Sequence, residues 1–257
     1  MIVRIHQQPA FILHHHGYSE TSLLLEVLTA QHGRIGLIAK GAKRPNSRVR
    51  GILKPFQRLL IGWSGKGELA TLTGAEADGA HAALEGSALY CGFYMNEVLL
   101  RLLHRHDPHD RLFEVYQAAL ERLCRNNSLQ EAVLRVFEKN LLRELGYALV
   151  LDHDIADKKP LEADVVYDYI FERGPLRLAN PELHRPTEGL RIRGASLLAL
   201  AQETLEDASA LRDAKALMRA ALARHLGEKP LHSRKLFRRS IPLSATEMEH
   251  KLDKVGS

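Results

Sequence analysis

Cysteine and long apolar runs are the scarcest features of this 257-residue sequence. Two cysteines, Cys91 and Cys124, are too few for a disulfide framework or a four-thiolate zinc site. No apolar run approaches the roughly 18 residues that a membrane-spanning helix needs. The N-terminal residues lack the long apolar stretch and the cleavage site of a signal peptide. We therefore expect a cytoplasmic protein that makes no membrane contact, with both thiols buried on apolar helix faces.

Motifs for nucleotide binding and catalysis are also missing. No Walker A sequence and no Gly-x-Gly-x-x-Gly follows a predicted strand, and there is no nucleophile elbow. His104, His106 and His109 resemble a metallohydrolase pattern only superficially, because the order of the aspartate and the last histidine is reversed. We predict no catalytic residue, no metal site and no cofactor. A metal-dependent nuclease or hydrolase that uses these three histidines is the least favoured alternative.

What is present is the composition of a packed globular chain, with 45% apolar and 26% charged residues. The length allows one large domain or two modest ones. The first eighty residues contain short apolar runs between glycines, serines and prolines, which predict strands. We expect the strands at 10–14, 22–29, 34–40, 52–62 and 68–73. Five short strands suit a small closed barrel, and periodicity alone does not separate an OB barrel from an SH3-like one.

After about residue 79 the apolar spacing changes to the helical period of 3.6. We expect helices at 88–104, 110–124, 129–145, 196–205 and 213–226, and a β-hairpin formed by 165–172 and 176–179. The predicted fold class is α+β, with a barrel followed by a mainly helical part that carries a small hairpin. The predicted domains are 1–79 and 80–257, with an insertion at about 150–190.

Charge is distributed unevenly along the chain, whose net charge is +5. No Asp or Glu occurs from residue 27 to residue 67, and that stretch holds nine basic residues: Arg34, Lys40, Lys43, Arg44, Arg48, Arg50, Lys54, Arg58 and Lys66. A barrel with this uncompensated charge is expected to bind a polyanion. Residues 40–50 are polar and interrupted by Gly and Pro, so we expect a mobile loop that follows a nucleic-acid backbone. The alternative is a non-enzymatic adaptor whose barrel docks an acidic protein.

Aromatic residues in the barrel region offer a second route to nucleic acid. Tyr18, Phe56 and Trp63 are candidates for stacking on bases, although Phe56 and Trp63 suit a core position equally well. His14, His15 and His16 stand at a strand end, where we expect them to be exposed.

A second basic cluster lies near the C-terminus and consists of Arg224, Lys229, Arg234, Lys235, Arg238 and Arg239. Between the two basic regions, residues 144–172 contain eight acidic residues and two lysines. The acidic stretch is interpreted as a solvated surface, and docking of a basic partner is the alternative left open.

Ordered motifs along the chain resemble those of the RecO family. The barrel region contains Ser19-Glu20-Thr21-Ser22-Leu23, Gly33-Arg34, Ala39-Lys40-Gly41-Ala42-Lys43-Arg44, Leu53-Lys54-Pro55-Phe56, Gly65-Lys66-Gly67-Glu68-Leu69 and Ala75-Glu76. The helical region contains Leu89-Tyr90-Cys91-Gly92-Phe93-Tyr94-Met95-Asn96-Glu97, Leu112-Phe113, Leu134-Arg135-Val136-Phe137-Glu138, Leu145-Gly146-Tyr147 and the run from Leu226 to Phe237. Each motif is weak by itself, whereas the ordered set is specific.

The resemblance implies a bacterial, nucleoid-associated mediator of DNA repair and recombination with an N-terminal OB fold. Such proteins bind single- and double-stranded DNA, anneal complementary strands, and work with RecR to load RecA onto coated single strands, without hydrolysing a nucleotide. The DNA-binding role would fall on Arg34, Lys40, Lys43, Arg44, Arg48, Arg50, Lys54, Arg234, Lys235, Arg238 and Arg239. Arg135 is carried over as a residue that binds the acidic, Phe-ended C-terminal tail of single-stranded DNA-binding protein.

One departure from the family pattern concerns zinc. Many members hold a zinc ion with four cysteines in the segment after Leu-Gly-Tyr, and residues 147–190 contain no cysteine. The chain thus resembles a zinc-free branch, and we expect its hairpin to be held together by packing alone.

Overall fold

The N-terminal strands close into a barrel. The computed structural model describes residues 4–65, 67–79, 83–125, 129–179, 189–227 and 229–233. The barrel strands are β1 (Arg4–Gly17), β2 (Leu23–Thr29), β3 (Gly33–Ala39), β4 (Arg58–Ser64) and β5 (Leu69–Ala77). They close in the order β1-β2-β3-β5-β4, with β3 and β5 parallel and every other pair antiparallel. This is the strand order of an OB fold, so the α+β class is confirmed and the SH3-like alternative is excluded.

Alternating apolar residues fill the barrel, as the period of two predicts. Leu25 and Val27 of β2 face the same interior as Ile35 and Leu37 of β3, and all four side chains are buried. Leu59 of β4 completes this layer. The charged residues between these positions therefore point outward, towards solvent or towards the helices.

Among the described residues after the barrel there are five helices, all at the predicted places: α1 (Gly86–Leu102), α2 (Asp110–Arg125), α3 (Gln130–Glu144), α4 (Gly194–Gln202) and α5 (Ala208–Leu226). The largest difference is at the start of α5, five residues before the predicted one. There the Asp207 carboxylate accepts hydrogen bonds from the backbone N–H groups of Ser209 (2.8 Å) and Ala210 (2.9 Å). This N-cap satisfies donors that a helix start otherwise leaves free, and it allows the helix to begin in a polar stretch.

The predicted hairpin is present as β6 (Val166–Ile170) and β7 (Gly174–Arg177). A third strand, β8 (Leu190–Arg193), pairs with the other edge of β6 and was not predicted. Tyr167, Tyr169 and Ile192 are buried in the same apolar cluster as the helices. Packing against the helices therefore contributes to the stability of this sheet.

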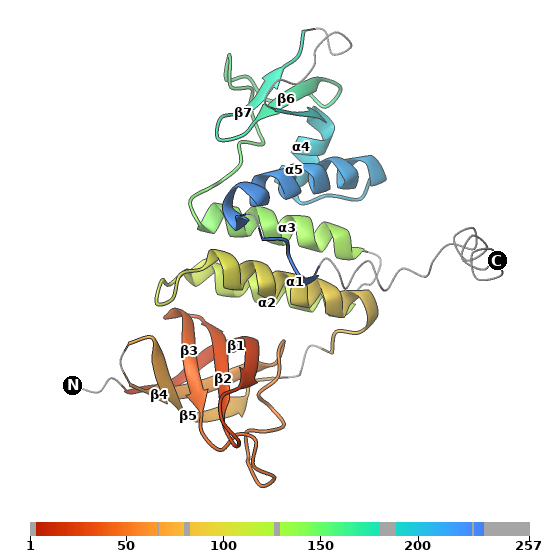
Figure 1. Ribbon diagram of the computed structural model, residues 1–257. Coiled ribbons are helices and arrows are strands. Elements are labelled where there is room, and N and C mark those ends of the chain that lie inside the picture. Colours follow the sequence, from red (N-terminus) through yellow and green to blue (C-terminus); the bar gives the residue numbers. More distant parts are fainter. Residues whose placement is uncertain are drawn as a thin grey trace, which may run out of the picture.

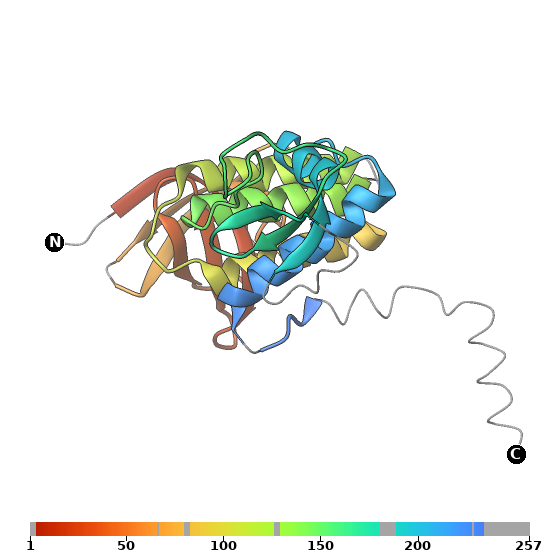
Figure 2. The ribbon, with the colours of Figure 1, turned by 90° about the horizontal axis from the view of Figure 1, so that it is seen from above.

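The elements are stacked in layers. Figure 1 shows the barrel at one end, then α1 with α2, then α3, then α5 with α4, and the β6–β7 hairpin at the opposite end. Seen from above, the hairpin lies over the helices rather than beside the barrel (Figure 2). Within the described ranges, no helix has the length and apolar character needed to cross a membrane.

The two cysteines occupy different environments. Cys91 on α1 is buried as expected, and its burial raises the pKa of the thiol to about 12. Cys124 on α2 is exposed, so the prediction that both are buried is wrong for this residue. It stands next to the buried Leu123, on the solvent side of the helical stripe.

A short segment beyond α5 returns to α1. The Glu97 carboxylate accepts hydrogen bonds from the backbone N–H groups of His232 and Ser233, both at 2.8 Å. Arg101, one turn further along α1, pairs with Glu97 at 2.9 Å and donates to the carbonyls of Lys229 and Pro230. We call residues 229–233 the docked segment, because α1 holds it through these contacts.

Glu97→Gln should release the docked segment. The bound N–H groups donate to an ionised acceptor, and such bonds contribute roughly 1.5–3 kcal/mol each, so we expect local opening to increase at least tenfold. Hydrogen exchange of peptides covering residues 227–233, read by mass spectrometry, measures this. Glu85→Gln, at the other end of α1 and without a side-chain cap bond, is the control. Unchanged exchange in Glu97→Gln would contradict the assignment.

The same contact should weaken in acid. Burial raises the pKa of Glu97, but the N–H groups of Ser233 and His232 and the nearby Arg101 outweigh it, so the pKa lies below its ordinary value of 4.5. A carboxyl group whose pKa is lowered by folding stabilises the folded form at any pH above its ordinary pKa. This contribution is lost as the pH falls through the lowered pKa of the folded form. Exchange of the docked segment, corrected for its intrinsic rate, is therefore expected to rise only below about pH 4.5.

Candidate nucleic-acid interface

The connection between β3 and β4 presents most of the predicted basic residues to solvent. We call residues 40–54 the basic loop; Figure 1 shows it in orange, extending from the end of the barrel away from the helices. Its cations are all exposed: Lys40, Lys43, Arg44, Arg48, Arg50 and Lys54. None of the six forms an ion pair with a described residue. This surface therefore has positive charge available for an anionic ligand.

The backbone of the basic loop is folded into turns. Successive hydrogen bonds run from Arg44 N to Gly41 O (3.1 Å), Ser47 N to Arg44 O (3.0 Å) and Arg50 N to Ser47 O (3.3 Å). Ala42 and Leu53 are buried at its two ends and join the barrel core. These small apolar residues among the cations therefore attach the loop to the barrel.

Lys43 links the basic loop to the turn between β1 and β2. Its backbone N–H donates to the carbonyl of Thr21, and its ammonium donates to the carbonyl of Ser19, both at 2.9 Å. The two loops thus form one surface. Lys43 contributes both to this attachment and to the surface charge.

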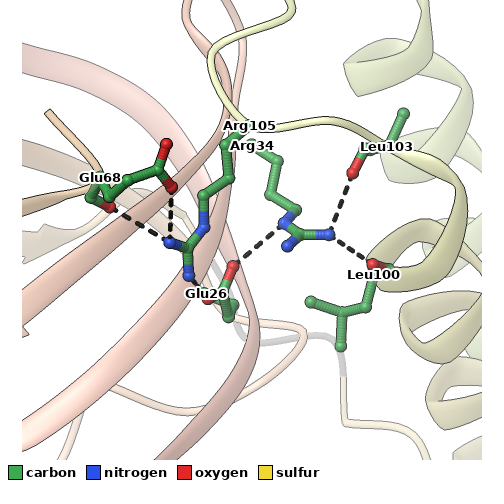
Figure 3. Close-up of polar contacts among 6 residues, drawn as sticks. All are labelled: Glu26, Arg34, Glu68, Leu100, Leu103 and Arg105. Atoms are coloured by element: carbon green, nitrogen blue, oxygen red, sulfur yellow. Dashed lines mark hydrogen bonds and ion pairs between the residues drawn. The ribbon is translucent and has the colours of Figure 1, made fainter.

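Arg34 has a different environment from the other candidates (Figure 3). Its guanidinium pairs with Glu26 at 3.0 Å and donates to the carbonyls of Leu100 and Leu103 at the end of α1. Cations are favourable there because the C-terminal carbonyls of a helix carry partial negative charge. The structure therefore uses Arg34 to join the barrel to the helices, and we leave it out of the proposed interface.

Arg105, from the α1–α2 connection, completes this junction. It pairs with the second carboxylate oxygen of Glu26 and with Glu68 at 3.0 Å (Figure 3). Gly33 lies beside the same connection, where a Cβ atom would stand 2.1 Å from the Asp107 carbonyl oxygen. Only glycine allows this approach of backbone to backbone, so barrel and helices meet closely.

The three aromatic candidates differ in burial. Phe56 is buried against α1, with its ring centroid 5.2 Å from that of Phe93, and Trp63 is buried in the barrel cluster. Both are core residues and are not available to bases. Tyr18, in the β1–β2 turn, is 56% exposed.

Arg135 lies inside the helical layers. Its side chain is 9% exposed, and its guanidinium pairs with the buried Glu138 one turn along α3 at 2.8 Å. A buried pair of this kind stabilises the fold only while both partners are present. In this conformation the Arg135 guanidinium is therefore largely buried and occupied by Glu138.

An apolar cavity of about 250 Å³ lies in the helical part, between α3, the segment 146–150 that follows it, α5 and the β6–β7 hairpin. Leu142 and Tyr169 line its floor. At its rim the Arg224 guanidinium carbon lies 4.6 Å from the Phe171 ring centroid, and Arg173 is exposed. Sequence reasoning did not find this cavity, because its walls come from four separate segments of the chain.

Some of the remaining candidates lie outside the described residues and others lie within them. Arg234, Lys235, Arg238 and Arg239 lie outside the described residues, as does Lys66. In the loop with His104, His106 and His109, the described contacts are a hydrogen bond from His106 N to Arg34 O (2.9 Å) and a His109–Asp107 pair (3.4 Å). Within the described part of the chain, no three His, Cys, Asp or Glu side chains are grouped so as to hold a metal ion.

Many acidic residues between 144 and 172 have local partners. Glu162 pairs with Arg177 at 2.6 Å, and Asp157 pairs with Lys159 at 2.8 Å. Asp154 accepts hydrogen bonds from the backbone of Ala156 and Arg177 at 2.7 and 2.8 Å. These contacts favour the interpretation of a surface that supports the small sheet.

Comparison with known proteins covers both parts of the chain. The family model described as Recombination protein O N terminal matches residues 1–79, and Recombination protein O C terminal matches residues 84–235. The DNA repair protein RecO of Nitrosococcus oceani is 47% identical over 91% of this chain and 93% of its own length. That of Coxiella burnetii is 48% identical over 92% of this chain and 99% of its own length. With both its OB barrel and its helical layers matched, the chain belongs to the RecO family of DNA repair proteins.

Proposed function

We propose that this protein binds single- and double-stranded DNA through the basic loop and anneals complementary strands. The observation that carries the proposal is the set of six exposed cations, without ion-pair partners among the described residues, on one side of an OB barrel. Phosphate contacts of this kind release counterions and need no base sequence. We assign DNA binding to a domain of residues 1–79 and the helical layers to a domain of residues 80–257.

Annealing requires that two mutually repelling strands be held together. The basic loop would hold one strand, and Arg234, Lys235, Arg238 and Arg239 would supply a second basic surface. The docked segment supports this arrangement, because α1 holds the chain immediately before these residues. The proposed action is charge neutralisation without a chemical step, so neither catalysis nor nucleotide hydrolysis is part of it.

The proposed partners follow from family membership. We propose that the protein acts with RecR to load RecA onto strands coated by single-stranded DNA-binding protein, in association with the nucleoid. Docking to the C-terminal tail of the coat protein would raise the local concentration of the annealer on coated strands.

For the tail we propose the cavity between α3, α5 and the hairpin rather than Arg135. An acidic peptide that ends in phenylalanine needs an apolar recess with cations at its rim. The cavity offers both, with Arg173 and Arg224 at the rim and Tyr169 on the floor. The rim also carries Glu172, whose carboxylate lies 3.8 Å from the Arg224 guanidinium and would give way to the carboxylates of the tail. Arg135 remains important for stability through its pair with Glu138.

Annealing of complementary oligonucleotides coated with single-stranded DNA-binding protein tests the proposed function. We expect this protein to accelerate annealing, less so in high salt, and less so when the coat protein lacks its tail. Failure to bind DNA at low salt would overturn the proposal and favour the adaptor that docks an acidic protein. Binding without annealing would restrict the function to loading.

Arg224→Ala tests the docking cavity. Loss of one charge pair at a partly exposed rim is expected to weaken binding of a tail peptide on the order of tenfold, by the 1.4 kcal/mol equivalence. Fluorescence anisotropy of a labelled peptide measures this. Arg219→Ala, an exposed arginine on the same helix, is the control. Equal affinities of the two variants would exclude the cavity as the tail site.

A further inference from the structure

Of the three aromatic candidates in the barrel, Tyr18, Phe56 and Trp63, only Tyr18 faces solvent. It is 56% exposed, the largest exposure among the described large apolar residues, whereas Phe56 and Trp63 are buried. An exposed tyrosine ring at a turn is not needed for the core. Its backbone N–H donates to the Ser22 carbonyl at 3.1 Å, so the turn that carries it is closed independently of the ring.

The position of Tyr18 relative to the basic loop is set by hydrogen bonds. Lys43 binds the carbonyls of Ser19 and Thr21, which follow Tyr18 within three residues. Lys43 is flanked by Arg44 and stands three residues after Lys40. The ring therefore belongs to the same surface as the cations that we propose contact phosphates.

Two further rings extend this surface along β1. His14 and His16 are exposed, and their ring centroids lie 5.9 Å apart. They alternate with His15, so both lie on the same side of the strand that leads to Tyr18. The end of β1 thus presents the imidazole rings of His14 and His16, and the turn that follows it carries Tyr18, which lies beside the basic loop.

The chemistry of this arrangement selects unpaired strands. A base in a single strand has free faces that stack on aromatic rings, whereas the bases of a duplex are stacked on each other and only their edges are accessible. The phosphates carry the same charge in a single strand and in a duplex. Cations alone therefore bind both forms, and rings beside them add affinity only for the single strand.

We propose that Tyr18, with His14 and His16, forms a base-stacking platform that gives the barrel a preference for single-stranded DNA. The inference rests on the proposed DNA binding by the basic loop and adds to it a site for the bases. A strand would lie with its phosphates along the basic loop and with unpaired bases against the end of β1. When those bases pair with a complementary strand, they would leave the rings. The phosphates would stay in contact with the basic loop, because a duplex has the same phosphates.

The test compares a single-stranded oligonucleotide with one of the same length made of abasic residues, which keeps the phosphates and lacks the bases. Binding is measured by anisotropy at one low salt concentration for the unaltered protein, Tyr18→Ala and Tyr18→Phe. Tyr147→Ala is the control, because Tyr147 is also more than half exposed and lies in the helical part. A duplex of equal length is the third ligand.

The unaltered protein is expected to bind the normal strand about tenfold more tightly than the abasic one, in line with stacking on a single ring. Tyr18→Ala should lose most of this difference without changing abasic or duplex binding, and Tyr18→Phe should retain it. Equal weakening of all three ligands by Tyr18→Ala, or no weakening, would overturn the platform and leave the basic loop intact. Absence of binding to any ligand by the unaltered protein would overturn the proposed function as well.

Discussion

Glu26→Gln is expected to lower the free energy of unfolding by about 3 kcal/mol. Glu26 receives Arg34 on one carboxylate oxygen and Arg105 on the other, and its side chain is only 13% exposed. A neutral amide would leave the partly buried Arg34 guanidinium without its anion and Arg105 with only the exposed Glu68. Removing one partner of a buried pair costs more than the pair contributes, because the other charge stays desolvated.

Glu68→Gln is the matched control, since it neutralises another carboxylate that pairs with Arg105. The Glu68 side chain is 76% exposed, so solvent replaces the lost pair and we expect a loss of at most about 1 kcal/mol. Urea unfolding followed by circular dichroism measures both variants. Equal losses would show that burial does not decide the strength of this junction.

Local patterns were sufficient for most of the fold because most elements here carry their own signal. The five helices have wide apolar stripes, and the barrel strands have the period of two. β8 has only four residues and is defined by its pairing with β6, which no local pattern contains. The choice of an OB barrel over an SH3-like one depended on the parallel pairing of β3 with β5, which also joins distant segments.

The unpaired cations of the candidate interface could be predicted because the surrounding sequence has no acidic residues. No acidic residue stands among the cations of residues 40–54, so those side chains have no local anion to pair with. Local sequence could not separate Arg34 from the exposed cations, because its partner, Glu26, stands one residue before the acid-free stretch and comes next to it only through the β2–β3 pairing. For Arg135 the signal was available in the sequence, since Glu138 follows at helical spacing on α3.

Reversing two charges of the basic loop should have the largest effect on DNA binding. In Arg44→Glu combined with Arg48→Glu, two phosphate contacts are lost and two repulsions replace them. We expect affinity for single strands to fall on the order of a hundredfold at low salt, and the slope of log affinity against log salt to decrease by about 1.4. Lys43 is left unchanged because it also holds the β1–β2 turn.

The control for this variant carries the same change in net charge at a distant place. Arg212→Glu combined with Arg219→Glu alters two exposed arginines of α5, which Figure 1 shows on the far side of the helical layers from the basic loop. If overall charge alone attracted DNA, both double variants would lose affinity and slope equally. A loss confined to the basic-loop variant, and uniform across oligonucleotide sequences, would instead locate the phosphate contacts on one face of the barrel. On that face the unpaired bases of a bound single strand would lie beside the exposed rings of His14, His16 and Tyr18. The bases of a duplex are already stacked on each other and cannot use these rings.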